Sequence, residues 1–98
     1  MSKHTPGKWV VAHRGFEGKP TVVAHRAGRP CTIALLESGA REEDAANARL
    51  ISAAPDLLDA LKRAAIDLTE KLEERGELAD SVTIALMHAA IAKAEGLS

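Results

Sequence analysis

The chain carries the same five residues, VVAHR, at two places, and each copy ends in a histidine followed by an arginine. The first copy supplies His13 and Arg14, and the second supplies His25 and Arg26. Histidine is a frequent metal ligand, whereas arginine suits phosphate because its planar fork donates two hydrogen bonds at once. The repeat therefore offers two chemistries, a metal site built on the histidines or an anion site built on the arginines.

Basic residues are concentrated around this repeat. Residues 1–35 hold six basic residues and one acidic residue, whereas the rest of the chain holds seven basic and thirteen acidic ones, although the net charge is only −1. Such asymmetry indicates a basic face able to meet an anion, and the alternative is that the two halves neutralise each other within or between subunits. Trp9 and Phe16 are the only aromatic residues that could stack on a base. The candidate anion- or partner-binding residues are Arg14, Arg26, Arg29, Lys19, His13, His25 and Trp9.

The metal interpretation is the weaker one. If the hairpin turns around Phe16–Gly18, the period of two along a strand places Arg14 and Arg26 on one face. The opposite face then holds Trp9, Val11, His13, Val23 and His25. The two histidines are not directly opposed in this register, and a third ligand is missing, so we expect neither a metal nor a cofactor.

The other reactive side chains do not form a catalytic set. Cys31 has no histidine near it in the sequence and fits a buried strand cysteine, and His88 lies in an apolar segment, as core or interface histidines do. No nucleophile, base and orienting group can be combined, and no nucleic-acid-binding motif is present. We therefore expect a protein that is not an enzyme and does not bind duplex DNA.

The residues before position 38 have the composition of β-strands. Three runs rich in β-branched residues alternate with segments rich in glycine and proline, GFEGKP and AGRP, which are typical of turns. The predicted strands are Trp9 to Arg14, Thr21 to Arg26 and Cys31 to Glu37. Three strands with one covered face are about the minimum for a stable sheet, so we predict a small antiparallel sheet.

The remaining residues have helical patterns. A first helix is predicted over 41–53, and Pro55 is taken as the first residue of a second helix over 55–75, where its missing N–H is not needed. Gly76 is a natural stop for that helix, and Asp80 or Ser81 can cap a third one. The predicted fold is a single α+β domain, 1–98, with antiparallel strands in 1–37 and two or three helices in 41–96 packed on one face.

The third predicted helix is apolar nearly all round, which is typical of a helix buried on most sides. Since a short domain poor in aromatic residues can hardly cover it, we expect a homo-oligomer, most simply a dimer. The candidate interface residues are Val82, Leu86, Met87 and Ile91. No apolar run approaches the roughly 20 residues of a membrane span, and the N-terminus lacks the apolar middle of a signal peptide. We therefore expect a cytoplasmic protein without a membrane partner.

Two segments of the chain resemble a known group of proteins. HTPGKW, residues 4–9, and NARLISAAPDLLDAL, residues 47–61, resemble the HTPG-x-W and NARLI-x-AAP-x-LL-x-AL elements of small uncharacterised bacteriophage and prophage proteins. Lys8 stands where proline is commoner in that group, and residues 10–37 match no pattern of it. The resemblance implies a phage-type origin and fold, and it implies no activity. Asn47 and Arg49 belong to the second element, where they either hold the helix to the sheet or face a partner.

Two functions are consistent with these patterns. The first is a non-catalytic phage or prophage accessory protein in the bacterial host cell that binds a host protein, with inhibition of a host defence system as one such role. The alternative is a small-ligand-binding protein that captures an anion or a nucleotide on its basic sheet. A deep pocket lined by the arginines favours the ligand, whereas an apolar rim favours a protein partner.

Overall fold

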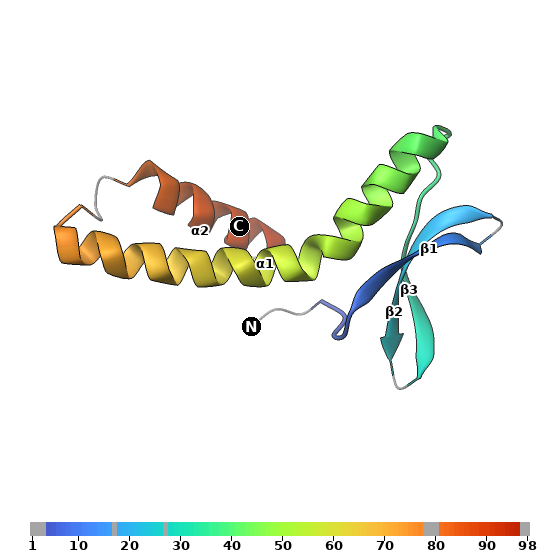
Figure 1. Ribbon diagram of the computed structural model, residues 1–98, viewed down its shortest axis with the longest axis horizontal. Helices are drawn as coiled ribbons and strands as arrows, with labels where there is room; N and C mark the ends of the chain where they lie inside the picture. The colour runs from blue at the N-terminus through green and yellow to red at the C-terminus, as the bar shows by residue number, and fades with distance from the viewer. Residues whose placement is uncertain (1–3, 17, 27, 78–80, 97–98) are drawn as a thin grey trace. The chain divides into compact units, whose positions relative to one another are not determined.

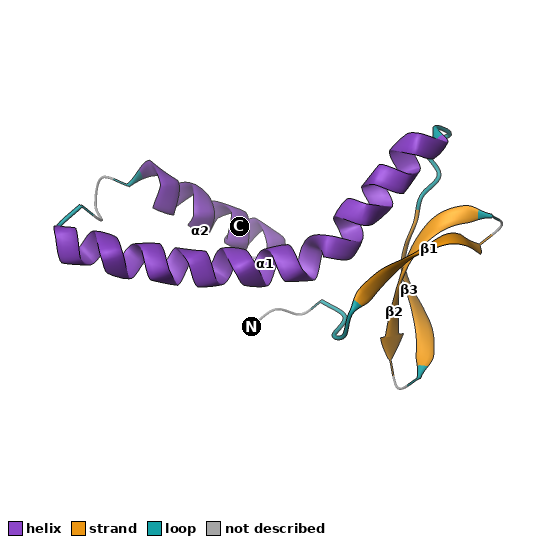
Figure 2. Cartoon of the chain, viewed as in Figure 1, coloured by secondary structure: helices purple, strands orange, loops and turns teal. Residues whose placement is uncertain are grey.

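The computed structural model describes residues 4–16, 18–26, 28–77 and 81–96, and Figure 1 shows the order of its elements. A three-stranded antiparallel sheet with strand order β1-β2-β3 is followed by two helices (Figure 2). This confirms the α+β class, with the sheet at the N-terminal end. The elements are β1 (Trp9–Phe16), β2 (Lys19–Arg26), β3 (Arg29–Leu35), α1 (Arg41–Arg75) and α2 (Val82–Ala94).

The chain divides into two compact units between Pro55 and Asp56. The first unit, His4–Pro55, holds the sheet and the first part of α1, and the second unit contains the rest of α1 together with α2. Each unit has buried apolar residues of its own: Val22, Ala24 and Ala48 in the first, and Ala65 and Ile84 in the second. In the described part of the chain, no helix combines the length and the apolar character that crossing a membrane requires.

The turn between β1 and β2 decides which side chains share a face of the sheet. Phe16 pairs with Lys19, so the loop between them has two residues, one fewer than the predicted turn over Phe16–Gly18. A shift of one residue in the register moves every side chain of a strand to the opposite face. The prediction that Trp9 and Val11 share a face with Val23 and His25 was therefore wrong.

The observed register places Trp9 opposite Ala24, and Val10 opposite Val23. Because side chains alternate along a strand, Val23 and His25 lie on the face opposite to Trp9. Arg26 was predicted to lie on the face opposite to Trp9. It lies instead on the same face as Trp9 and Ala24. The pairing is irregular between Ala12 and Phe16, the stretch that contains His13.

Helix α1 is a single helix of 35 residues with Pro55 inside it, so the predicted break into helices over 41–53 and 55–75 was wrong. A proline inside a helix removes one backbone hydrogen bond and is unfavourable by about 3 kcal/mol. The residues before it, Ser52–Ala54, contain no glycine that would end a helix in the left-handed conformation. Helix formation therefore continues through the proline.

The start of α1 is fixed by a buried carboxylate. The backbone N–H of Ser38 donates a hydrogen bond to Oδ1 of Asp44 at 2.9 Å, and the N–H of Ala40 donates to the Ser38 hydroxyl at 3.3 Å. Asp44 is only 6% exposed, and its negative charge lies in the first turns of the helix, where the helix dipole favours an acid. The bond from Ser38 to Asp44 thus ties the loop after β3 to α1, and the bond from Ala40 to Ser38 closes the loop itself.

The other helix ends follow the sequence prediction. Gly76 adopts a positive φ of 70°, and the N–H groups of Glu77 and Gly76 donate to the carbonyls of Leu72 and Glu73 at 2.9 and 3.1 Å, respectively. This is the hydrogen-bond pattern of a glycine-terminated helix. The Ser81 hydroxyl accepts a 3.1 Å bond from the N–H of Ile84 and so caps α2, as predicted. The alternative cap, residue 80, lies outside the described residues.

Candidate functional site

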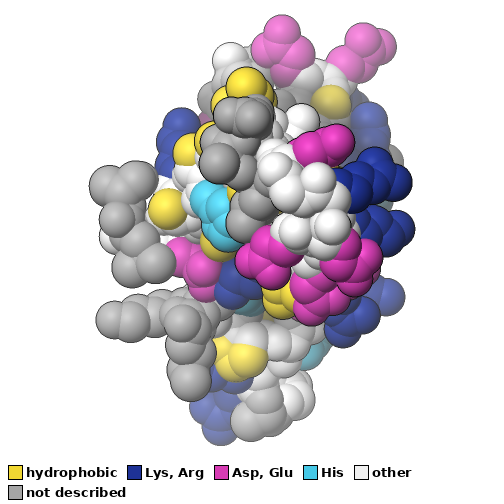
Figure 3. Space-filling view, turned by 90° about the vertical axis from the view of Figure 1, so that its left-hand side faces the viewer, with side chains coloured by type: hydrophobic (Ala, Val, Ile, Leu, Met, Phe, Trp, Pro, Cys, Tyr) yellow, Lys and Arg dark blue, Asp and Glu magenta, His cyan; other side chains and the backbone are white. Residues whose placement is uncertain are grey.

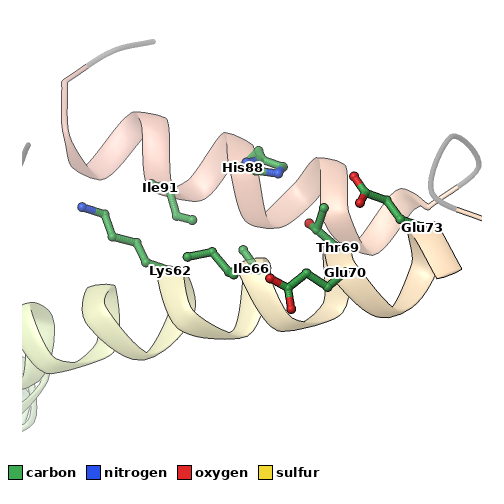
Figure 4. Close-up of a pocket in the computed structure, with 8 residues that line it drawn as sticks. Lys62, Ile66, Thr69, Glu70, Glu73, His88 and Ile91 are labelled. Atoms are coloured by element: carbon green, nitrogen blue, oxygen red, sulfur yellow. The ribbon is translucent and has the colours of Figure 1, made fainter.

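A groove opens between the two helices of the second unit, with a volume of about 510 Å³. Figure 4 shows α1 and α2 side by side, with lining side chains from both helices directed into the space between them. Ala65, Ile66 and Ile91 supply its apolar surface. The polar side chains of the lining are Lys62, Thr69, Glu70, Glu73 and His88. The groove is therefore an apolar trough with a charged rim.

The local sequence explains why this space is hollow. Apolar residues recur every three or four positions along this part of α1 and form a stripe, Leu58, Leu61, Ala65, Leu68 and Leu72. The stripe faces inward, because Ala65 is 3% exposed and Leu61 and Leu68 are half-buried. On α2, Ile84 is the buried residue. A stripe with alanine at its centre fills little volume, so the two helices leave a trough along one side. Ile66, immediately after Ala65, is 59% exposed and forms part of the edge of that trough.

A partly buried ion pair joins the two helices at the end of the groove where α2 finishes. Nζ of Lys62 lies 2.6 Å from Oε2 of Glu95, and the side chains are 33% and 8% exposed. A carboxylate removed from water requires a cation or hydrogen-bond donors. Glu95 also sits at the C-terminal cap of α2, where the helix dipole disfavours an acid. Lys62 offsets both unfavourable effects and is thereby committed to a partner within the chain.

The other charges on the rim are acidic and exposed. Within the residues that the structure describes, Glu70 and Glu73 make no ion pair. Figure 3 faces the end of the second unit where α1 stops, and it shows acidic side chains exposed next to basic ones on this surface. The last turns of α1 and the two residues after it carry four acidic residues, Glu70, Glu73, Glu74 and Glu77, and two basic ones, Lys71 and Arg75. With Lys62 neutralised by Glu95, the rim presents negative charge.

The structure does not bring all of the predicted basic residues together. Lys19 starts β2 and lies 3.3 Å from Oε1 of Glu37, whereas Arg26 ends the same strand. At about 3.3 Å per residue, these two positions are about 23 Å apart. Arg29 is the direct cross-strand partner of Arg26. The side chain of Arg14 lies outside the described residues.

The remaining predicted sheet residues are separated from one another. His25 is exposed opposite Pro30, on the face away from Trp9. His13 is exposed and lines a second hollow with Pro20 and Arg41. In the described parts of the chain, no group of three or more histidine, cysteine, aspartate or glutamate side chains is placed to hold a metal ion.

Trp9 is held by the segment that precedes it. The indole Nε1–H donates to the Thr5 carbonyl at 3.0 Å, and the His4 ring lies edge-on with the ring centroids 5.8 Å apart. Gly7 has a positive φ of 94°, and a Cβ atom added there would approach the His25 carbonyl oxygen to 3.3 Å. The HTPGKW segment thus folds against β1 and the end of β2.

The residues predicted for self-association lie on two sides of α2. Val82 and Leu86 are 71% and 66% exposed, respectively. Met87 and Ile91 are half-buried, and Ile91 lines the groove. The groove residues Lys62, Ile66, Glu70 and Glu73, and the partner residue Glu95, were not predicted from the sequence. The one available signal was Ile66, an apolar residue outside the regular stripe of α1.

The fold and the groove define a small α+β protein that carries a trough between two helices. The family described as Salmonella phage P22 protein Y8K6 matches residues 1–98, and the chain belongs to this family. Its phage-type origin, which the resemblance implied, is therefore confirmed, while the two short elements remain an interpretation of the sequence. The comparisons with curated proteins and with solved structures found no match.

Proposed function

We propose that this phage protein is an accessory protein that acts without catalysis, by binding a protein of the bacterial host in the groove between α1 and α2. The observation that carries the proposal is the apolar trough of about 510 Å³ with acidic side chains along its rim. This volume falls within the roughly 300–1,000 Å³ of typical binding pockets. Membership of a phage protein family supports the accessory role.

The occupant that fits this groove is an amphipathic helix with basic flanks. Two helices that lie side by side form a trough, and a third helix can place its apolar side chains in it. This is a common mode of peptide recognition. Ile66 and Ile91 would contact those side chains. Glu70 and Glu73 would pair with lysine or arginine on the flanks of the incoming helix, because complementary charges steer association and favour the matching partner.

The finer part of the proposal concerns the target and the place of action. We propose that the target belongs to a host defence system and that the encounter takes place in the cytoplasm of the bacterial cell. The motive for this choice of target is the phage family, because a phage protein acts in a bacterial host. Cell fractionation tests the location. Plating of a defended host that expresses the wild-type chain or a groove variant tests the target, because an anti-defence protein raises phage plating and the groove variant does not.

The binding experiment compares two exposed apolar residues of α1. Ile66 lines the groove, whereas Leu57, 54% exposed on the same helix, does not. Proteins captured from host lysate by the wild-type chain would be identified, and the affinity of each purified candidate would be measured. We expect Ile66→Lys to lose the partner and Leu57→Lys to retain it. Equal binding by both variants, or a partner without a basic amphipathic helix, would contradict the proposal.

A further inference from the structure

The turn that joins β2 and β3 brings two arginines together. Arg26 and Arg29 are direct cross-strand partners, both are exposed, and the loop between them has two residues, including Gly28 at a positive φ of 78°. Directly opposed residues of an antiparallel pair share a face, with Cβ atoms roughly 4.5–5.5 Å apart. The register therefore places the Cβ atoms of the two arginines side by side at the end of the sheet, where both guanidinium groups can reach one ligand.

This arrangement lacks an internal counter-charge. Like charges directly opposite each other destabilise a strand pair. Within the described residues, neither Arg26 nor Arg29 makes an ion pair, whereas Lys19, at the other end of β2, has Glu37 at 3.3 Å. The described acidic residues of the first unit all lie in 37–44, which follow the end of β3 and so belong to the Lys19 end of the sheet.

An aromatic ring lies on the same face as the arginine pair. Trp9 is opposite Ala24, and Arg26 is two residues farther along β2. Trp9 and Arg26 are therefore diagonal neighbours on one face, with Cα atoms roughly 7–8 Å apart. The start of β1 and the β2–β3 turn lie at the same end of the sheet (Figure 1). The hydrogen bond from the Trp9 indole to the Thr5 carbonyl limits rotation of the ring at this end of the sheet.

We propose that Arg26 and Arg29 bind the phosphate groups of a nucleotide whose base stacks on Trp9. Two planar forks can each donate two hydrogen bonds to phosphate oxygens, and the bound negative charge removes the repulsion between the guanidinium groups. Stacking on an aromatic side chain adds affinity with little dependence on which base is present. The site belongs to the first unit and is independent of the groove between the helices.

Calorimetric titration with ATP and with inorganic triphosphate tests the site. We expect the wild-type chain to bind ATP more tightly than triphosphate, and Arg26→Gln or Arg29→Gln to lower ATP affinity at least tenfold. Lys19→Gln is the matched control, because it removes a basic residue that already has an acidic partner, and Ile66→Lys leaves the site intact. Absence of ATP binding by the wild type, an equal loss in Lys19→Gln, or equal affinity for ATP and triphosphate would overturn the nucleotide site.

Thermal melting gives a second readout that separates binding from folding. Without ligand, Arg26→Gln should melt no lower than the wild type, because the substitution removes a repulsion. ATP should raise the midpoint of the wild type and leave that of Arg26→Gln unchanged, since a ligand stabilises only a protein that binds it. A lower midpoint for ligand-free Arg26→Gln would show that the arginine has a stabilising partner inside the chain, and it would overturn the proposal.

Discussion

Nζ of Lys62 lies 2.6 Å from Oε2 of Glu95, across 33 positions of the sequence, and this contact fastens the end of α2 to the middle of α1. Glu95 is the more buried partner, so removing the lysine and removing the carboxylate should have different effects on stability. Loss of the lysine leaves a carboxylate shielded from water, whereas loss of the carboxylate leaves an ammonium group that can still reach solvent.

We therefore expect Lys62→Met to lower the free energy of unfolding by about 1.5–3 kcal/mol, the usual range for a hydrogen bond to a charged group. The double variant Lys62→Met with Glu95→Gln should recover part of this loss, because it no longer buries a carboxylate that has lost its lysine. Urea denaturation measures both effects. Lys19→Met, which breaks a pair of exposed side chains, should have an effect of no more than about 1 kcal/mol. Equal unfolding of Lys62→Met and the wild type would contradict this account of the ion pair.

Pro55→Ala should stabilise the chain. The proline lies inside α1, where alanine is more favourable by as much as about 3 kcal/mol and restores a backbone N–H donor. Helix content from circular dichroism and the melting temperature should both rise. A proline at a helix start would behave in the opposite way, with no gain on substitution. An unchanged or lower melting temperature would therefore favour two separate helices.

We expect the chain to self-associate through the outer side of α2. Val82 and Leu86 lie one turn apart there and are 71% and 66% exposed, respectively. A helix of 13 residues is about 20 Å long, so its face offers less than the roughly 800 Å² per partner of a standard interface. The dimer should therefore dissociate on dilution through micromolar concentrations. Sedimentation should show Leu86→Lys as a monomer, with Ile66→Lys still dimeric. A wild-type chain that stays monomeric at high micromolar concentration would contradict this expectation.

Asp44→Ala should destabilise the first unit, because the substitution removes the acceptor of the Ser38 N–H and an acid from the first turns of α1. The expected loss is about 1–2 kcal/mol, the upper part of the range for helix-capping side chains. Asp44→Asn, which keeps an acceptor oxygen and removes the charge, should lose less. Chemical denaturation of the two variants separates the hydrogen bond from the charge. A larger loss in Asp44→Asn than in Asp44→Ala would contradict this role.

Local signals predicted the elements of this fold, and contacts distant in sequence decided the details. The β-branched runs, Gly76 and Ser81 act through neighbouring residues, so the strands and two helix ends followed from the sequence. The faces of the sheet depended on a single residue in the loop before Lys19, and the composition of that loop did not specify its length. The prediction of a break at Pro55 was wrong because proline only prefers the start of a helix. The helix-forming residues on both sides outweighed that preference.

The candidate site was harder to predict than the fold. Arg26 was selected from the VVAHR repeat and Arg29 from the concentration of basic residues, and their direct opposition required the observed β2–β3 register. The groove depends on the pairing of α1 with α2, and no pattern in the sequence connects Lys62 with Glu95. Ile66 falls outside the stripe because it faces the edge of the helix pair, so periodicity alone treats it as a surface residue.

Pro55 has a consequence for the cooperativity of unfolding. It stands at the boundary between the two compact units, and it has no amide hydrogen to donate to the carbonyl of Ile51. Local opening spreads through contiguous cooperative units, and a position that lacks its helical bond is a natural border between two of them. We therefore expect α1, although one continuous helix, to open as parts of two cooperative units. Native-state hydrogen exchange should divide its amides into two protection classes that meet at this residue.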